Sequence, residues 1–268
     1  MDIKRVTSAL LGFPLVIVVL LFGNKYVIDA VMAIVAIISL QEYFNAFKEY
    51  KPIKWIGYLL AFLICFIHLV PQEQLFSYIG LSIPVVIVAL FIELVIKDLK
   101  INIIDIAITL FGIFYVALFT MFIPLLAGTE NGKILIWYAI FAAWGRDTTA
   151  YIVGKTFKLG KHKFSKVSPN KSVEGCIAGV IGAVILSLIF TVCINKFMQF
   201  DISYVKVLIV SAILSVIGQF GDFAASSIKR FTGIKDFSNL IPGHGGLLDR
   251  IDSLIFISPF AYILLTLI

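Results

Sequence analysis

The sequence predicts an all-α, polytopic integral membrane protein with about nine transmembrane helices. Its 268 residues are 60% hydrophobic and only 14% charged, and the mean hydropathy is +1.04. Apolar runs of about 18 residues recur along the chain, which is long enough for a helix to cross a bilayer. This composition excludes the soluble globular classes. With no internal repeat in the sequence, a single membrane domain over residues 1–268 is the simplest expectation.

Hydropathy defines the crossings in chain order, with an error of about 2 to 4 residues at each boundary. They span residues 6–22, 27–47, 53–70, 80–96, 101–127, 134–154, 173–195, 203–228 and 251–268. The first follows Lys4 and Arg5 and lacks a small-residue cleavage site, so we interpret it as a retained helix. Cys65, Cys176 and Cys193 lie in apolar segments and are expected to be small core residues rather than disulfide or zinc ligands.

The distribution of basic residues orients the predicted crossings. The connections on the side of the N-terminus hold seventeen of the 22 Lys and Arg residues, the other side holds four, and Arg146 lies inside a crossing. Because cytoplasmic connections are enriched in Lys and Arg, this asymmetry predicts a cytoplasmic N-terminus and a C-terminus on the far side. It also explains the net charge of +6 without nucleic-acid binding, which we do not expect.

Acidic residues inside crossings are costly and therefore mark candidate functional positions. Asp147 and Asp222 lie in the predicted cytoplasmic halves of their helices, and Glu174, Asp249 and Asp252 lie at cytoplasmic helix starts. We predict that these five carboxylates converge at one depth. Three other acidic residues are expected only to pair with neighbouring Lys and Arg: Glu42, Glu93 and Asp105.

The densest polar cluster runs from Ser226 to Ser253 and combines carboxylates, basic residues and glycines. Carboxylate oxygens without paired histidines or thiolates suit Mg²⁺, and a metal beside basic residues suits a triphosphate. The segment 242–246 leads into the last crossing and predicts a phosphate-binding nest, although an ordinary glycine-rich turn explains it equally well. His244 is either a proton donor to a leaving phosphate or a structural hydrogen-bonding residue.

A second polar region runs from Trp144 to Gly175. Arg146 and Asp147 lie inside a crossing and, as sequence neighbours, are expected to point in different directions, each with its own partner or an aqueous cleft. The lysines between 155 and 166 fit contacts with anionic lipid headgroups at least as well as catalysis.

The polar cluster from Ser226 to Ser253 resembles the signature of phosphatidate cytidylyltransferases, also called CDP-diacylglycerol synthases. The matching positions are Ser226, Ile228, Lys229, Arg230, Lys235, Asp236, Ser238, Ile241, Pro242, His244, Gly245, Gly246, Leu247, Asp249, Arg250, Ile251 and Asp252. Two looser matches lie upstream, around Asp147 and over residues 168–175, where the family usually has threonine near Ser172. The resemblance covers the C-terminal half of the chain.

The resemblance implies transfer of the cytidylyl group from CTP to phosphatidate, giving CDP-diacylglycerol and pyrophosphate, with Mg²⁺. It also implies a second, monovalent cation such as K⁺, a homodimer, and a bacterial-type inner or cell membrane with the site facing the cytoplasm. The expected catalytic residues are Asp147, Asp222, Lys229, Arg230, His244, Asp249 and Arg250. The expected substrate-binding residues are Lys171, Ser172, Glu174, Ser226, Lys235, Asp236, Gly245 and Gly246. The expected metal ligands are Asp222, Asp249 and Asp252.

Within the single domain, residues 134–268 are expected to form the catalytic half. Residues 1–133 are expected to serve as a scaffold, with lipid access or oligomer contacts. Three alternatives stay open. A CDP-alcohol phosphotransferase would carry an Asp-Gly, Ala-Arg and spaced-Asp signature that the sequence lacks, and a transporter would carry charges at several depths. A cytidylyltransferase that acts on a prenol or dolichol phosphate is the hardest to distinguish from a phosphatidate cytidylyltransferase.

Overall fold

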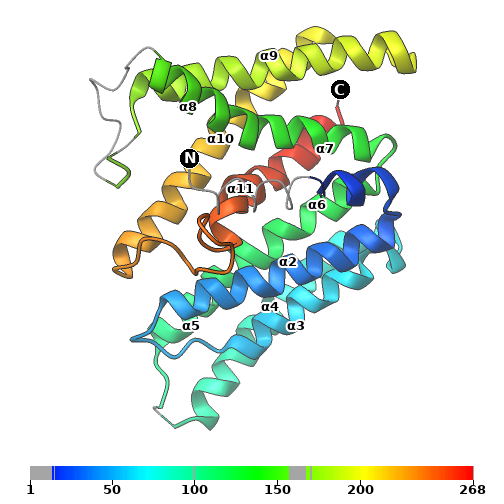
Figure 1. Cartoon of the computed structure of the whole chain (residues 1–268). Helices are drawn as coiled ribbons and strands as arrows, with labels where there is room; N and C mark the ends of the chain where they lie inside the picture. Colours follow the sequence, from blue (N-terminus) through cyan, green and yellow to red (C-terminus); the bar gives the residue numbers. More distant parts are fainter. Residues whose placement is uncertain (1–13, 15, 99, 157–166, 170, 268) are drawn as a thin grey trace. The chain divides into compact units, whose positions relative to one another are not determined.

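The computed structural model describes residues 14, 16–98, 100–156, 167–169 and 171–267, and these residues form helices with no β-strand (Figure 1). The α-helices are α2 (Lys25–Ala46), α3 (Lys54–Leu63), α4 (Gln72–Ile96), α5 (Ile103–Gly112), α6 (Phe119–Ala127), α7 (Gly132–Ile140), α8 (Arg146–Thr156), α9 (Val173–Met198), α10 (Tyr204–Phe231) and α11 (Leu248–Leu265). A 3₁₀ segment, η1 (Ile64–Leu69), extends α3, and π segments η2 (Ile113–Leu118) and η3 (Phe141–Gly145) join α5 to α6 and α7 to α8. The all-α prediction is confirmed for these residues.

Five of the described helical segments are long and apolar enough to cross a membrane. They are Lys25–Ala46, Gln72–Ile96, Ile103–Ala127, Val173–Met198 and Tyr204–Phe231, with Lys54–Leu69 a shorter apolar helix. The predicted crossings after the first coincide with helical segments, but α4 begins at Gln72 and not at residue 80, because Pro71 starts the helix ahead of polar residues. Most of the first predicted crossing, 6–22, lies outside the described residues. The number of nine crossings and the orientation stay predictions.

The chain divides into two compact units, and the single domain with a catalytic half over residues 134–268 stays a prediction. The first comprises Met1–Gly128 and Thr232–Arg250, and the second comprises Thr129–Phe231 and Ile251–Ile268. The signature segment is therefore divided: its glycine-rich part belongs to the first unit, together with the N-terminal helices. Each unit is described by itself.

Helix α2 is the centre of the first unit, because it packs against α3, η1, α5, η2 and α6. Its first turn is capped by the side chain of Asn24, which accepts a hydrogen bond from the backbone N–H of Val27 at 2.9 Å. Further along α2, the buried carboxylate of Asp29 lies 2.7 Å from His68 Nδ1 and links the helix to η1. A buried polar pair of this kind fixes the register of the two segments.

The segment Thr232–Leu247 of the first unit consists of turns rather than a helix. The backbone N–H of Ile241 donates to the carbonyl of Gly245 at 2.8 Å, which closes a tight turn. Gly243 and Gly245 have φ of +75° and +84°, a region that side chains disfavour. The glycines of this turn are therefore required by its backbone conformation.

The second unit is built on α9, which packs against α8, η3 and α10. Ser172 caps α9 by accepting a hydrogen bond from the N–H of Gly175 at 3.1 Å. The π segment η3 ends at Gly145, directly before Arg146 and Asp147. Widened turns of this type are frequent at functional sites, because they re-aim the side chains that follow.

Two of the three acidic residues that we expected to pair with basic side chains behave differently. Glu93 does pair with Lys97, at 3.1 Å, as predicted. Asp105, however, accepts hydrogen bonds from the backbone N–H groups of Lys51 and Asn102, at 2.7 and 2.8 Å. Among the described residues, Glu42 accepts hydrogen bonds from a serine hydroxyl and two backbone N–H groups. For both residues the prediction was wrong, because backbone donors outcompete flexible, solvated lysines at buried positions.

Close contact between α8 and α9 gives a testable prediction. A Cβ atom at Gly182 would lie 2.4 Å from Thr149 Cγ2 and 2.5 Å from Thr149 Cβ, so rotation of the threonine side chain cannot relieve the clash. We expect Gly182→Ala to destabilise the protein by about 1 to 3 kcal/mol. Gly80→Ala in α4 is the matched control, because a Cβ there meets no described atom within 4 Å. Thermal unfolding in detergent checks both; equal midpoints for the two variants would contradict the packing described.

Candidate functional site

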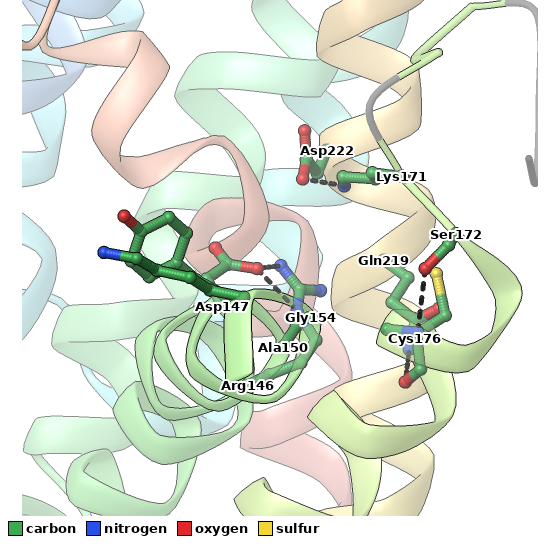
Figure 2. A pocket seen from close by; sticks show the side chains of 12 residues that line it. Arg146, Asp147, Ala150, Gly154, Lys171, Ser172, Cys176, Gln219 and Asp222 are labelled. Carbon is green, nitrogen blue, oxygen red and sulfur yellow. Dashed lines mark hydrogen bonds and ion pairs between the residues drawn. The ribbon is translucent and has the colours of Figure 1, made fainter. Parts of the chain in front are cut away.

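A cavity of about 500 Å³ lies within the second unit, between α8, the start of α9 and α10 (Figure 2). Its charged and polar lining consists of Arg146, Asp147, Lys171, Ser172, Gln219 and Asp222. The cavity thus brings together three sequence-predicted pieces: the motif around Asp147, the motif over residues 168–175, and Asp222. Sequence analysis predicted that Asp147 and Asp222 lie at one depth, and the structure shows that both line one cavity with Lys171.

Lys171 and Asp222 face each other in this cavity as an ion pair between Nζ and Oδ2 (Figure 2). Both side chains are about three-quarters buried, with 25% and 22% of their surface exposed. The Lys171 ammonium also lies over the ring of Phe223, 4.6 Å from its centroid. Burial, reinforced by the Arg146 guanidinium, lowers the pKa of Lys171 to about 8, against the opposing effect of Asp147 and Asp252. Lys171 is therefore a poorly hydrated cation held in a defined position.

Arg146 and Asp147 pair with each other, contrary to the expectation that each has a separate partner. The guanidinium folds back so that Nε and Nη2 donate to Asp147 Oδ1 at 2.9 and 2.5 Å (Figure 2). Nη2 also donates to Ser253 Oγ at 3.0 Å, and Nη1 is buried with no hydrogen-bond partner among the described residues. The Arg146 side chain is 3% exposed and that of Asp147 is 51% exposed. The pair thus presents a buried cation behind an accessible carboxylate.

Hydrogen bonds between α9 and α10 fix the remaining wall of the cavity. Gln219 donates from Nε2 to the carbonyl of Cys176 at 3.1 Å, and Ser172 caps the same end of α9 (Figure 2). Gln219 lies three residues before Asp222, so the amide and the carboxylate project from one face of α10. The start of α9, which follows Lys171 and Ser172, is therefore tied to the helix that carries Asp222.

Other sequence-predicted residues of the second unit lie outside the cavity lining. Asp252 is buried, and its Oδ1 accepts a hydrogen bond from the N–H of Ser253 at 2.6 Å. Its carboxylate is within electrostatic range of Lys229, Asp147 and Lys171. Arg230 donates to the carbonyl of Val167 at 3.4 Å. The other three are Ser226 and Lys229, in the last turns of α10, and Glu174, in the first turn of α9.

The rest of the predicted site belongs to the first unit: Lys235, Asp236, His244, Gly245, Gly246, Asp249 and Arg250. Asp249 is 8% exposed, and its Oδ2 accepts hydrogen bonds from the N–H groups of Phe237 and Gly246, at 2.8 and 3.0 Å. The N–H groups of Leu247 and Leu248 donate to Glu42. The donors at the start of α11 that we predicted for a substrate phosphate are thus used by protein carboxylates.

The donor set within the second unit is compatible with Mg²⁺. Among the described residues, no group of three or more His, Cys, Asp and Glu side chains is arranged to hold a metal. Mg²⁺, however, usually takes one or two protein carboxylates, with substrate phosphates and water filling its shell. Asp222 and the accessible Asp147 line one cavity beside two cations. That chemistry fits a metal that arrives bound to phosphates.

Three residues that were not among the predicted site residues contribute to these arrangements. Arg146 was expected to have its own partner or an aqueous cleft but was not among the predicted site residues, and neither was Gln219. Glu42 was assigned to simple charge pairing. The signal that could have found all three is a polar side chain in the middle of an apolar helix, which needs a specific partner.

Apolar, membrane-length helices and a cavity lined by two cations and two carboxylates define a helical membrane protein with a charged cavity. The chain belongs to the cytidylyltransferase family, whose model matches residues 3–268. It is similar to a protein of Staphylococcus haemolyticus (strain JCSC1435) named phosphatidate cytidylyltransferase, with 34% identity over 97% of this chain and 98% of that protein. A Staphylococcus aureus (strain COL) protein of the same name is 33% identical over 97% and 98%. A Bacillus subtilis (strain 168) protein of that name is 42% identical over 60% of this chain and 58% of that protein.

Proposed function

We propose that the protein transfers the cytidylyl group of CTP to phosphatidate, giving CDP-diacylglycerol and pyrophosphate in phospholipid biosynthesis. Membership of the cytidylyltransferase family and full-length similarity to proteins named phosphatidate cytidylyltransferase support this activity. The structural observation that carries the proposal is the cavity in which Lys171 and Arg146 lie beside Asp222 and Asp147. Such a cavity is suited to a polyphosphate, because cations neutralise phosphate charge and carboxylates accept the accompanying metal.

The reaction requires one bond to form and one to break. A phosphate oxygen of phosphatidate attacks the α-phosphorus of CTP, and the bond from this phosphorus to the oxygen bridging the α- and β-phosphates breaks, with its electron pair leaving on pyrophosphate. The ionised phosphatidate is already a nucleophile, so no general base is needed. The protein acts by placing the two phosphates in line and by stabilising the charge that develops.

Lys171 and Arg146 are the cations of the cavity that would bind phosphate oxygens. The Lys171 ammonium pairs with Asp222 and can exchange this carboxylate for a phosphate oxygen, which leaves Asp222 available to a metal. A metal–nucleotide complex brings negative phosphates for Lys171 and a positive metal for Asp222, so neither side chain loses an oppositely charged partner in the exchange. Buried Arg146 keeps its contact to Ser253 and contributes positive charge to the wall of the cavity.

Asp222 and Asp147 would hold Mg²⁺ in this cavity, and the bound metal would supply positive charge against the negative charge of the phosphates. Asp249 and Asp252 stay proposed ligands from the sequence, and a monovalent cation such as K⁺ stays a proposal from the family resemblance. Phosphate binding is likewise proposed for Lys229, Arg230 and Arg250, and proton donation to the leaving pyrophosphate for His244. The other substrate-binding assignments are also proposals: Ser172, Glu174, Ser226, Lys235, Asp236, Gly245 and Gly246.

The membrane setting is also part of the proposal. The asymmetry of Lys and Arg supports nine crossings with the N-terminus and the site on the cytoplasmic side, where CTP is available. We further propose a bacterial-type inner or cell membrane and a homodimer. Phosphatidate carries its phosphate at the level of the headgroups, so a site at the cytoplasmic surface gives both substrates access.

The choice of lipid acceptor is the direct test. Purified protein with Mg²⁺ and labelled CTP is given phosphatidate, a polyprenyl phosphate or diacylglycerol in separate mixed micelles. We expect lipid-linked cytidylyl product from phosphatidate alone. Product from the polyprenyl phosphate and none from phosphatidate would replace the proposed substrate with another lipid phosphate, and no lipid product from any acceptor would contradict cytidylyl transfer to lipids.

A further inference from the structure

Glu42 is an acidic residue buried in the first unit, on an apolar helix far in sequence from the signature. It is 5% exposed in α2, and its carboxylate accepts three hydrogen bonds from the segment that precedes and starts α11. Ser238 Oγ donates to Oε1 at 2.6 Å, the N–H of Leu247 donates to Oε1 at 2.9 Å, and the N–H of Leu248 donates to Oε2 at 2.7 Å. The carboxylate thus ties both ends of the segment Ser238–Leu248 to α2.

The backbone of the segment approaches this carboxylate closely at Gly246. A Cβ atom at Gly246 would lie 2.6 Å from Glu42 Oε2 and 2.7 Å from Oε1. No such atom fits without displacing the carboxylate. Gly245, by contrast, is required by its φ of +84°. The two adjacent glycines of the signature are therefore required for different reasons: Gly245 by its backbone conformation, and Gly246 by the close approach of the Glu42 carboxylate.

Consecutive N–H groups at the start of α11 are shared between two carboxylates. Asp249 accepts from Gly246, while Glu42 accepts from Leu247 and Leu248. Hydrogen bonds to a charged acceptor are stronger than neutral ones, and the helix dipole favours an anion at this end. Glu42 consequently supplies, from another helix, the cap that fixes where α11 begins and how Asp249 and Arg250 are presented.

We propose that Glu42 is a positioning residue of the enzyme: it holds the glycine-rich turn and the start of α11 in the geometry that the reaction uses. It touches neither substrate nor metal, and it acts through Ser238, Leu247 and Leu248. This role rests on the proposed function for its kinetic consequence, but the hydrogen-bonded geometry can be tested without it.

Glu42→Gln is the informative change, because it preserves side-chain shape. A glutamine amide has one acceptor oxygen in place of two, so one of the N–H donors at Leu247 or Leu248 faces an NH₂ group and loses its partner. We expect kcat for CDP-diacylglycerol synthesis to fall by about 10- to 100-fold, with a smaller change in KM for CTP. Losses of this size are typical when a residue that orients the site residues is replaced. We also expect faster deuterium exchange at the amides of residues 246–248.

Asp105→Asn is the matched control. Asp105 is 2% exposed in the same unit and also accepts hydrogen bonds from two backbone N–H groups, but those belong to Lys51 and Asn102. The control is expected to lower thermal stability while kcat of the folded protein stays within about twofold. Equal losses of kcat in the two variants, or wild-type kcat in folded Glu42→Gln, would overturn the positioning role.

Ser238→Ala covers the case in which Glu42→Gln does not fold. It removes only the hydroxyl donor, and we expect a several-fold lower kcat and faster exchange at residues 238–241. Wild-type values for both would overturn the proposal. If the wild-type enzyme makes no CDP-diacylglycerol, the proposed function fails, whereas the exchange measurements still decide whether Glu42 holds the segment.

Discussion

Replacement of Asp222 by asparagine is expected to lower kcat for CDP-diacylglycerol synthesis by about 100- to 1,000-fold, the effect of removing one preorganised electrostatic group. The substitution removes the charge that pairs with Lys171 and that we propose as a metal ligand. It also weakens the affinity for Mg²⁺, so the metal concentration for half-maximal rate should rise. Initial rates over a range of MgCl₂ concentrations, with labelled CTP and phosphatidate in micelles, measure both effects.

Asp201→Asn is the control for this change. Asp201 belongs to the same unit but lines a separate cavity with Thr129, Glu130 and Asn131. The control variant should retain the rate and the Mg²⁺ dependence of the wild type. Undiminished activity of Asp222→Asn, with thermal unfolding unchanged, would remove Asp222 from the proposed site.

Replacement of Lys171 by methionine is expected to have the second largest effect, a decrease of about 100-fold in kcat/KM for CTP. Methionine is similar in length to lysine but carries no charge, so the change leaves Asp222 without its counter-charge. A charge-assisted hydrogen bond contributes about 1.5 to 3 kcal/mol. Because Lys171 and Asp222 are in contact, the double variant should lose much less than the product of the two single losses.

Lys206→Met provides the comparison for Lys171. Lys206 is exposed and donates to the carbonyl of Leu267, at a distance from the cavity lining. Steady-state kinetics of the two single variants and the double variant form the complete set. A loss of activity in the double variant equal to the product of the losses in Lys171→Met and Asp222→Asn would contradict a functional interaction between the two side chains.

Much of the helical architecture follows from hydropathy alone. The ends of α2, α9 and α10 lie within a few residues of the predicted crossings, because long apolar runs must be helical to satisfy their backbone in a membrane. The start of α4 was misplaced, since Gln72, Glu73 and Gln74 belong to the helix although they are polar. Hydropathy detects the apolar part of a helix, whereas Pro71 sets its first turn.

The site was predictable in its residue types and less so in its partners. Asp147 and Asp222 were candidates as acidic residues inside apolar crossings, and Lys171 was a candidate from the family resemblance; the three do line one cavity. The fold-back of Arg146 onto Asp147 was missed, because neighbouring helical residues diverge at Cβ and only a long, flexible side chain can return. The contact from Glu42 to Leu248 joins residues 206 positions apart, and no local pattern encodes it.

The fate of the phosphorus atoms of CTP tests the proposed reaction most directly. Purified protein is incubated with phosphatidate, Mg²⁺ and CTP labelled at either the α- or the γ-phosphate, and lipid and aqueous products are separated. The proposed attack at the α-phosphorus predicts that the α-label enters the lipid as CDP-diacylglycerol while the γ-label is released as pyrophosphate, and that Asp222→Asn suppresses both. Entry of the γ-label into lipid, or release of the γ-label as orthophosphate without lipid labelling, would contradict cytidylyl transfer.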